Sequence, residues 1–147
     1  KSLCIKPGEK VWIVLIDVIT VNDDGNLFDA AALAANAALL DAYFPKLEDD
    51  KIDFKEKTNK KLGLTKIPVS VTVYKLGKHF FVDPSNDEKD AADARLTVVS
   101  LEDGKLCAMQ KGGDDELLVK DIIKMIEISQ EKGKELRAIL KKSKKEK

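Results

Sequence analysis

The chain has 147 residues, of which 44% are hydrophobic and 35% charged, with 26 basic and 26 acidic side chains. This composition suits one soluble domain, and the balanced charge excludes a global field that would attract nucleic acid. No stretch approaches the roughly 20 apolar residues of a membrane span, and the first ten residues lack the apolar core of a signal peptide. We therefore expect a cytoplasmic protein with no membrane partner.

The two cysteines, Cys4 and Cys107, lie far apart in the sequence among apolar neighbours. Neither belongs to a CxxC motif or to a Cys/His spacing typical of a metal site. We therefore predict two buried free thiols rather than a disulfide or metal ligands. No metal or other cofactor is expected.

The first elements are a strand and a helix. Residues 10–21 form a β-branched run that is too dense for a strand with one wet face, so we predict a central strand covered on both sides. Residues 22–26 indicate a turn, and Asp29 then favours the dipole of a helix that runs to about Tyr43. Because residues 30–40 are almost entirely Ala and Leu, this helix is predicted to lie in the core.

The middle of the chain predicts a connection followed by two hairpins. Residues 45–66 mix charges without a period and indicate a long solvated connection. Residues 68–84 alternate apolar and hydroxyl side chains and turn at Leu76-Gly77, which predicts a hairpin. Residues 94–113 repeat the pattern around Asp103-Gly104. We expect each hairpin to pair mostly with itself.

The closing segment predicts a long helix from Asp114 onward, with acids at its start and lysines at its end. The apolar residues at helical spacing are Leu117, Leu118, Ile122, Met125, Ile126, Leu136, Ile139 and Leu140. The predicted order is β-α-β-β-β-β-α. This order indicates an α+β fold, with helices packed on a mainly antiparallel sheet.

Three stretches carry a family resemblance: residues 2–40, residues 66–113 and the closing helix. Their most specific segments read DGNLFDAA and DARLTVVSLEDGKLCAMQKGG. The chain resembles the RNase PH family, and most closely the non-catalytic RNase PH-like ring subunits of archaeal exosomes.

The resemblance implies the C-terminal half of such a subunit, because family members carry a further segment of comparable length before these stretches. The implied division is residues 1–45 as the end of the first subdomain, 46–66 as a charged connection, 67–141 as the second subdomain and 142–147 as a basic tail.

In active members of the family, the turn before the first helix resembles G-G-T-R-T-A-A and would hold the phosphate that attacks RNA. Here the loop is about two residues longer, Phe28 replaces the arginine and Asp29 replaces the hydroxyl that follows it. Loss of one such donor costs on the order of 10²–10³ in rate, and a carboxylate would repel phosphate further. Taken alone, Asp29 is an ordinary helix cap or dipole partner. Both interpretations predict no phosphate site at Gly25, Asn26, Leu27, Phe28 and Asp29.

Asp93 matches the position of the family's catalytic carboxylate, which the resemblance implies would assist protonation of the leaving 3′-oxygen. A general acid without bound phosphate has no nucleophile to serve. We therefore interpret Asp93 as a structural relic that makes turn or strand-end hydrogen bonds.

Other candidates favour structural roles. His79 is interpreted as a strand-edge histidine without a catalytic partner, and Gly112-Gly113 as the turn between the last strand and the last helix. Trp12, Phe80 and Phe81 are predicted to be core residues.

The resemblance implies a subunit that is not an enzyme by itself. It would pair with a catalytic homologue in a hetero-oligomeric, hexameric ring that degrades RNA 3′ to 5′ by phosphorolysis, and would contribute to RNA binding and to the partner's activity. Further implied partners are RNA and cap proteins with RNA-binding domains. Only two basic residues, Arg95 and Arg137, are arginines, so any RNA contacts are expected to be diffuse. The alternatives are an exoribonuclease active in its own right and an unrelated α+β interaction domain.

Overall fold

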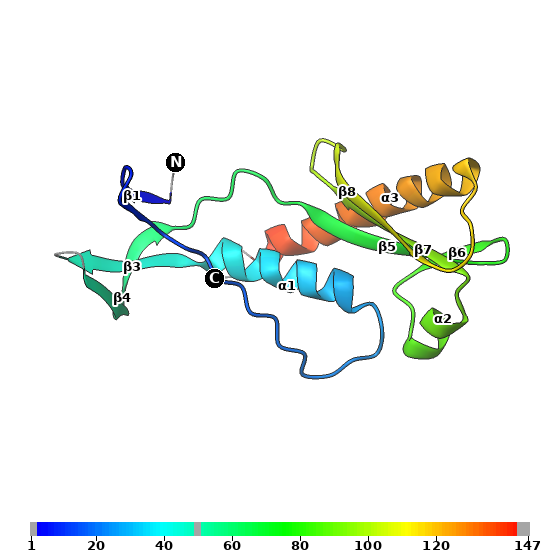
Figure 1. Cartoon of the computed structure of the whole chain (residues 1–147), viewed down its shortest axis with the longest axis horizontal. Helices are drawn as coiled ribbons and strands as arrows, with labels where there is room; N and C mark the ends of the chain where they lie inside the picture. The colour runs from blue at the N-terminus through cyan, green and yellow to red at the C-terminus, as the bar shows by residue number, and fades with distance from the viewer. Residues whose placement is uncertain (1–2, 49–50, 144–147) are drawn as a thin grey trace.

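The computed structural model describes residues 3–48 and 51–143 and is elongated (Figure 1). A sheet backed by a long helix, α3, forms one end, and two separate two-stranded sheets, β1-β2 and β3-β4, form the other, with helix α1 between them. In chain order the elements are β1-β2-α1-β3-β4-β5-β6-α2-β7-β8-α3. The predicted α+β class with mainly antiparallel sheet is confirmed, although the chain contains more elements than the predicted order.

The main sheet is antiparallel and has the strand order β6-β5-β7-β8. Its strands are β5 (Val69–Leu76), β6 (His79–Val82), β7 (Ala94–Ser100) and β8 (Leu106–Gly113). Both predicted hairpins are confirmed. The expectation that each hairpin pairs mostly with itself is wrong, because β5 pairs with β7 from Val69↔Ser100 to Lys75↔Ala94. β6 is half the length of β5 and covers only one end of its other edge.

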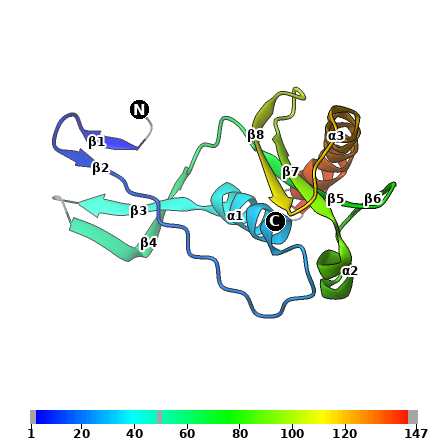
Figure 2. The ribbon, with the colours of Figure 1, turned by 45° about the vertical axis from the view of Figure 1, so that its right-hand side comes forward.

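The core lies between this sheet and α3 (Val119–Ser143), which runs behind the strands in Figure 2. Alternate residues of β5 and β7 point to the helix, as the two-residue period of a strand requires. On α3, Leu140 and one ridge of residues at every fourth position are buried. The ridge consists of Asp121, Met125, Ser129, Gly133 and Arg137. The helix begins later than the predicted Asp114, and Leu118 and Ile139, which the periodicity includes, are more than half exposed.

Helix α1 (Leu27–Asp41) ends near the predicted residue but is less buried than predicted. Its only buried residues are polar, Asp29 and Asn36. The Asn36 amide donates to the carbonyl oxygen of Pro68 at 2.7 Å, so α1 lies along the part of the β5 edge that β6 leaves uncovered. An Ala-rich helix suits this place because its small side chains let it approach the strand closely.

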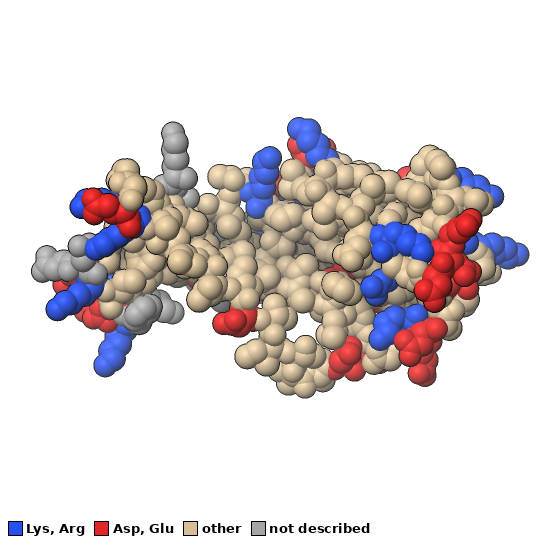
Figure 3. All heavy atoms as spheres, in the orientation of Figure 1, with Lys and Arg blue, Asp and Glu red and all other residues tan. Residues whose placement is uncertain are grey.

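The predicted central strand at residues 10–21 is wrong. Only Lys10–Val11 forms a strand, β2, which pairs with β1 (Cys4–Lys6). We call residues 12–21 the apolar strip; it includes Leu15, which is 82% exposed, and Val21, which is 95% exposed. In Figure 3 the segment that loops below α1 is almost free of charged atoms. Among the described residues no strand offers an edge to this segment, so its β-branched composition finds no pairing.

Residues 45–66 were predicted to be a solvated connection, and most of them form a second hairpin instead. Strands β3 (Tyr43–Glu48) and β4 (Lys51–Lys61) pair in antiparallel fashion. Lysines of β4 cover aromatic rings of β3, with the Lys60 ammonium 5.2 Å from the ring centroid of Phe44. Charged side chains on both faces hide the alternation that predicts a strand, which is why the sequence pattern misses it.

A short helix, α2 (Asn86–Ala91), was not predicted. Ser85 and Glu88 form a capping box: the Ser85 hydroxyl accepts from the Glu88 N–H, and the Glu88 carboxylate accepts from the Ser85 N–H. The S-x-x-E pattern that makes this box is visible in the sequence, so this element was open to prediction.

Candidate functional site

The turn before α1 is closed on itself and packed onto the loop before α2. The Gly25 N–H donates to the Asp23 carboxylate at 2.8 Å, so one backbone donor of the turn already has an anionic partner. Gly25 has φ +91°, and a Cβ there would lie 2.2 Å from the Pro84 carbonyl oxygen. Residue 25 must therefore be glycine for the turn to reach this loop.

Asp29 points away from the turn and into the protein. It is 8% exposed, and its carboxylate accepts from the Ser70 hydroxyl at 2.6 Å, the Thr72 N–H at 2.5 Å and the Thr72 hydroxyl at 3.1 Å. The cap role weighed for Asp29 is wrong, because the N-cap is Asn26, whose side chain makes no capping bond. Asp29 instead joins α1 to the free edge of β5, through partners 41 and 43 residues away.

Phe28 points outward and meets an arginine from another element. The ring is 55% exposed, and the Arg95 guanidinium carbon lies 5.1 Å from its centroid. The position for which the resemblance implies an arginine in active family members thus holds an aromatic ring, and a cation beside it comes from β7.

Asp93 lies just before β7 and is engaged with the β5–β6 turn. Its carboxylate accepts from the Gly77 N–H at 2.6 Å, and its own N–H donates to the Lys75 carbonyl oxygen at 2.9 Å. Asp93 lines neither of the pockets beside the turn before α1. The structure therefore places Arg95 beside the turn before α1 and directs the Asp93 carboxylate to the β5–β6 turn.

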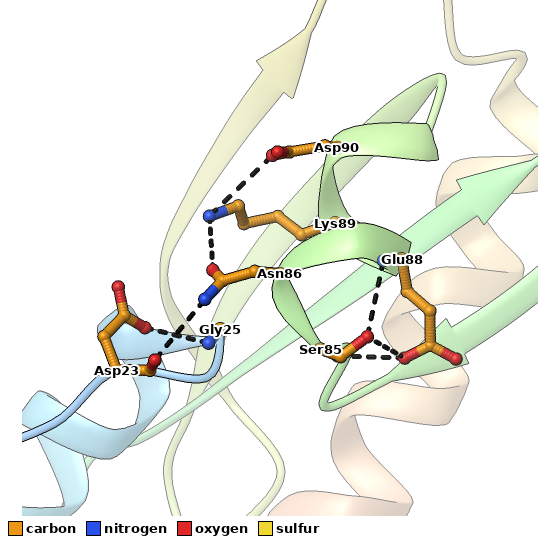
Figure 4. Close-up of polar contacts among 7 residues, drawn as sticks. All are labelled: Asp23, Gly25, Ser85, Asn86, Glu88, Lys89 and Asp90. Atoms are coloured by element: carbon orange, nitrogen blue, oxygen red, sulfur yellow. Dashed lines mark hydrogen bonds and ion pairs between the residues drawn. The ribbon is translucent and has the colours of Figure 1, made fainter.

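Two adjoining pockets open beside the turn, with volumes of about 350 and 210 Å³. Both are lined by Tyr74, Lys89 and Arg95, and the smaller one is also lined by Phe28. Figure 4 shows how α2 meets the turn: the Asn86 amide donates to the Asp23 carbonyl oxygen at 3.4 Å, and the Lys89 ammonium donates to the Asn86 side-chain oxygen at 2.9 Å. Sequence reasoning did not single out Lys89 and treated Arg95 only as one of two arginines.

The remaining candidates lie elsewhere. His79 is exposed on the edge strand β6, and the Gly112-Gly113 pair ends β8 rather than forming a free turn. Trp12, Phe80 and Phe81 are half-buried rather than fully in the core, and Trp12 packs on Phe44 at 5.6 Å between ring centroids.

Both cysteines are free thiols, but the predicted burial is wrong: Cys4 and Cys107 are exposed because they lie on β1 and on the edge strand β8. In the described part of the chain, no group of three or more His, Cys, Asp or Glu side chains could hold a metal ion. None of the helices in residues 3–48 and 51–143 is long and apolar enough to cross a membrane.

Both halves of the chain match models of the same protein family. The family model described as 3′ exoribonuclease family, domain 1, matches residues 1–45, and the model for domain 2 of the same family matches residues 66–132. The chain is 40% identical over 139 residues to the exosome complex component Rrp42 of Methanosarcina acetivorans, covering 95% of this chain and 50% of that protein. It is 39% identical over 145 residues to the Rrp42 component of Methanothermobacter thermautotrophicus, covering 97% of this chain and 54% of that one. The chain thus spans about half the length of the curated relatives it matches.

Solved structures show the same relationship. A chain of an archaeal exosome core superposes with a TM-score of 0.83 at 38% identity, over 95% of this chain and 55% of that one. A chain of the Archaeoglobus fulgidus exosome with RNA bound to the active site gives a TM-score of 0.81 at 38% identity, over 93% and 52% of the two chains. With both domain models matched in their expected order and the RNase PH-like fold in place, the chain belongs to the 3′ exoribonuclease family of RNase PH proteins.

Proposed function

We propose that this chain is part of a non-catalytic RNase PH-like subunit of an archaeal RNA exosome. The subunit pairs with a catalytic homologue in a hexameric ring that degrades RNA 3′ to 5′ by phosphorolysis, and contributes to RNA binding and to the partner's activity. The relatives named as exosome components and the exosome core structures support the assembly. Cytoplasmic location and contact with RNA-binding cap proteins belong to the same proposal.

The non-catalytic role is supported by one observation, the commitment of Asp29 to β5. The Asp29 carboxylate brings a negative charge to the inner side of the first turn of α1, where three hydrogen bonds hold it. At the same turn, the Asp23 carboxylate already accepts a hydrogen bond from the Gly25 N–H. Like charges repel, and the buried Asp29 carboxylate is screened little by water, so this turn disfavours the nucleophile that phosphorolysis needs.

A thermal-shift measurement tests this view directly. Millimolar phosphate is expected to leave the melting temperature unchanged, because a ligand stabilises only the state that binds it. Stabilisation by phosphate that disappears when the turn is replaced by a Gly-Ser loop of the same length would show that the turn is a working anion site.

A second test addresses Asp93 in the assembled complex. Asp93→Asn is expected to leave the phosphate-dependent degradation rate unchanged, because the catalytic carboxylate would belong to the partner. The Asn side chain can still accept from the Gly77 N–H, so folding should be preserved. A large fall in rate, with an unchanged melting temperature, would contradict the proposal.

The same result would favour the alternative, an exoribonuclease active in its own right, for which the matching position of Asp93 is the supporting observation. That alternative predicts release of nucleoside diphosphates from poly(A) by the subunit alone with phosphate present. We expect no release.

A further inference from the structure

The groove formed by the two pockets beside the turn has no role in the proposal above. Its cations come from two elements: Arg95 is half-buried on β7, and Lys89 lies on α2 with its side chain 35% exposed. Both residues line both pockets, as does Tyr74. The groove therefore brings two positive charges together beside the turn. Two carboxylates also line it, Asp90 in the larger pocket and Asp23 in the smaller one, and the Asp23 carboxylate is engaged with the Gly25 N–H.

Arg95 is held in place by apolar and backbone contacts rather than by a carboxylate. Its guanidinium lies over the Phe28 ring, and a Cβ at residue 112 would lie 2.5 Å from the Arg95 Nε, so Gly112 leaves the space that the side chain occupies. Within the described part of the chain, the guanidinium has no carboxylate partner and no hydrogen-bond acceptor. The contact with the Phe28 ring keeps the guanidinium beside the turn, and its N–H donors remain available to a ligand.

Lys89 is held by α2. Its ammonium donates to the Asn86 side chain at 2.9 Å and lies 3.9 Å from the Asp90 carboxylate, which is too far for a strong ion pair. Since Asn86 also bonds the turn, the Lys89 ammonium is kept on the side of α2 that faces the turn (Figure 4). The capping box at Ser85 fixes the start of the same helix.

We propose that this groove binds a phosphodiester group of single-stranded RNA, with Arg95 as a bidentate donor and Lys89 as a second charge. The inference rests on the proposed function, which brings RNA to the ring. The Arg fork matches the geometry of phosphate oxygens, and the exposed Phe28 ring offers a neighbouring base a surface for stacking. The groove thus differs from the phosphate site of active relatives, because β7 and α2 hold the anion and the helix turn does not.

RNA fits this groove better than a free phosphate ion. Two side-chain cations without a cradle of backbone N–H groups bind a single ion weakly, whereas a polymer brings adjacent phosphates and bases to the same surface. The exposed aromatic ring beside the cations also favours a nucleic acid over a protein carboxylate, which needs no stacking partner.

The test is RNA binding by the full-length subunit in its assembled complex, measured as the fluorescence anisotropy of a labelled oligo(A). The variants are Arg95→Gln and Lys89→Gln, with Arg95→Lys as the conservative exchange. Lys124→Gln is the matched control, because Lys124 is an exposed, ion-paired lysine on α3. We expect Arg95→Gln to weaken binding about tenfold and to lower the slope of log K against log salt by about 0.7, the value for one single-strand phosphate contact. Arg95→Lys should keep the salt slope but lose part of the affinity, and the control should bind as the wild type does.

The outcomes separate this inference from the proposed function. If the wild-type complex binds RNA and Arg95→Gln binds it equally well, the groove is not an RNA site and the inference is overturned, while the proposed function stands. If Arg95→Gln dissociates the complex in light scattering, the groove holds a partner's carboxylate, which also overturns the inference. A wild-type complex that binds no RNA overturns both. Cross-linking of 4-thiouridine RNA to a peptide that contains Phe28 or Lys89 would support the inference by a second route.

Discussion

Two apolar, β-branched segments of this chain have opposite fates. Residues 69–74 form the centre of the main sheet, where every residue is buried, and Val73 is 0% exposed. The apolar strip is at least as hydrophobic, yet most of its large side chains face solvent. The first segment has β7 on one edge, β6 and α1 on the other and α3 on its face, whereas the strip pairs with no strand among the described residues. A hydrophobic composition therefore does not by itself bury a segment. Burial also requires elements that are distant in the sequence to pack against it.

The same charge placed in each of the two segments tests whether they differ in burial. Val73→Asp should destabilise the fold by about 5 kcal/mol, because the carboxylate would be buried without a partner. The matched variant Val18→Asp should leave the free energy of unfolding nearly unchanged, since Val18 is 59% exposed. Urea unfolding followed by circular dichroism measures both. Equal losses in the two variants would show that the strip is buried in solution.

Variants of Asp29 test the contact between α1 and the part of the β5 edge that β6 leaves uncovered. Asp29→Ala should cost about 3 kcal/mol, because the Thr72 N–H and two hydroxyls lose their acceptor while remaining buried. Asp29→Asn keeps the shape and one acceptor oxygen and should cost less. Asp24→Ala, on the exposed part of the same turn, is the control and should cost almost nothing. If Asp29→Ala were as stable as the control, the helix would not be joined to β5 by this carboxylate.

Helix α2 differs from both segments, because the local bonds of its capping box start it. Ser85→Ala should cost about 1 kcal/mol, the usual effect of losing an N-cap hydroxyl. Bonds from the backbone and side chain of Ser85 lower the pKa of Glu88. A lowered pKa means that this contribution is present above the ordinary carboxyl pKa and is lost as the pH falls through the folded-state value. Thermal melts between pH 7 and pH 3 should therefore show a smaller acid-induced change in Ser85→Ala than in the wild type.

Substitutions in the apolar strip should have the smallest effect on the free energy of unfolding. Leu15→Ser combined with Ile19→Ser should change the free energy of unfolding by less than about 0.5 kcal/mol per site, since both side chains are more than 80% exposed. The 147-residue chain alone should self-associate through this surface, and the double variant should be more nearly monomeric. Light scattering after size exclusion and binding of a hydrophobic dye measure this. A wild-type monomer without dye binding would contradict the expectation.

Much of the fold was predictable wherever the signal is local. The alternation around Val69–Val73 and the turns at Leu76-Gly77 and Asp103-Gly104 predicted two hairpins that the structure contains. Helical spacing predicted α3 to within a few residues of its start. These patterns arise between residues a few positions apart, so the sequence displays them directly.

The turn before α1 shows where sequence reading succeeds and where it stops. The family resemblance of the sequence predicts that Phe28 and Asp29 stand where a phosphate site would need an arginine and a hydroxyl. The contacts of these two residues are set by the tertiary structure. Ser70 and Thr72 bond Asp29, and Arg95 lies on Phe28, and all three come from strands more than 40 residues away in the sequence. Strand pairing and side-chain contacts across such distances depend on which strand edges remain free after the local elements form. The pattern of residues along the chain does not show which edges these are.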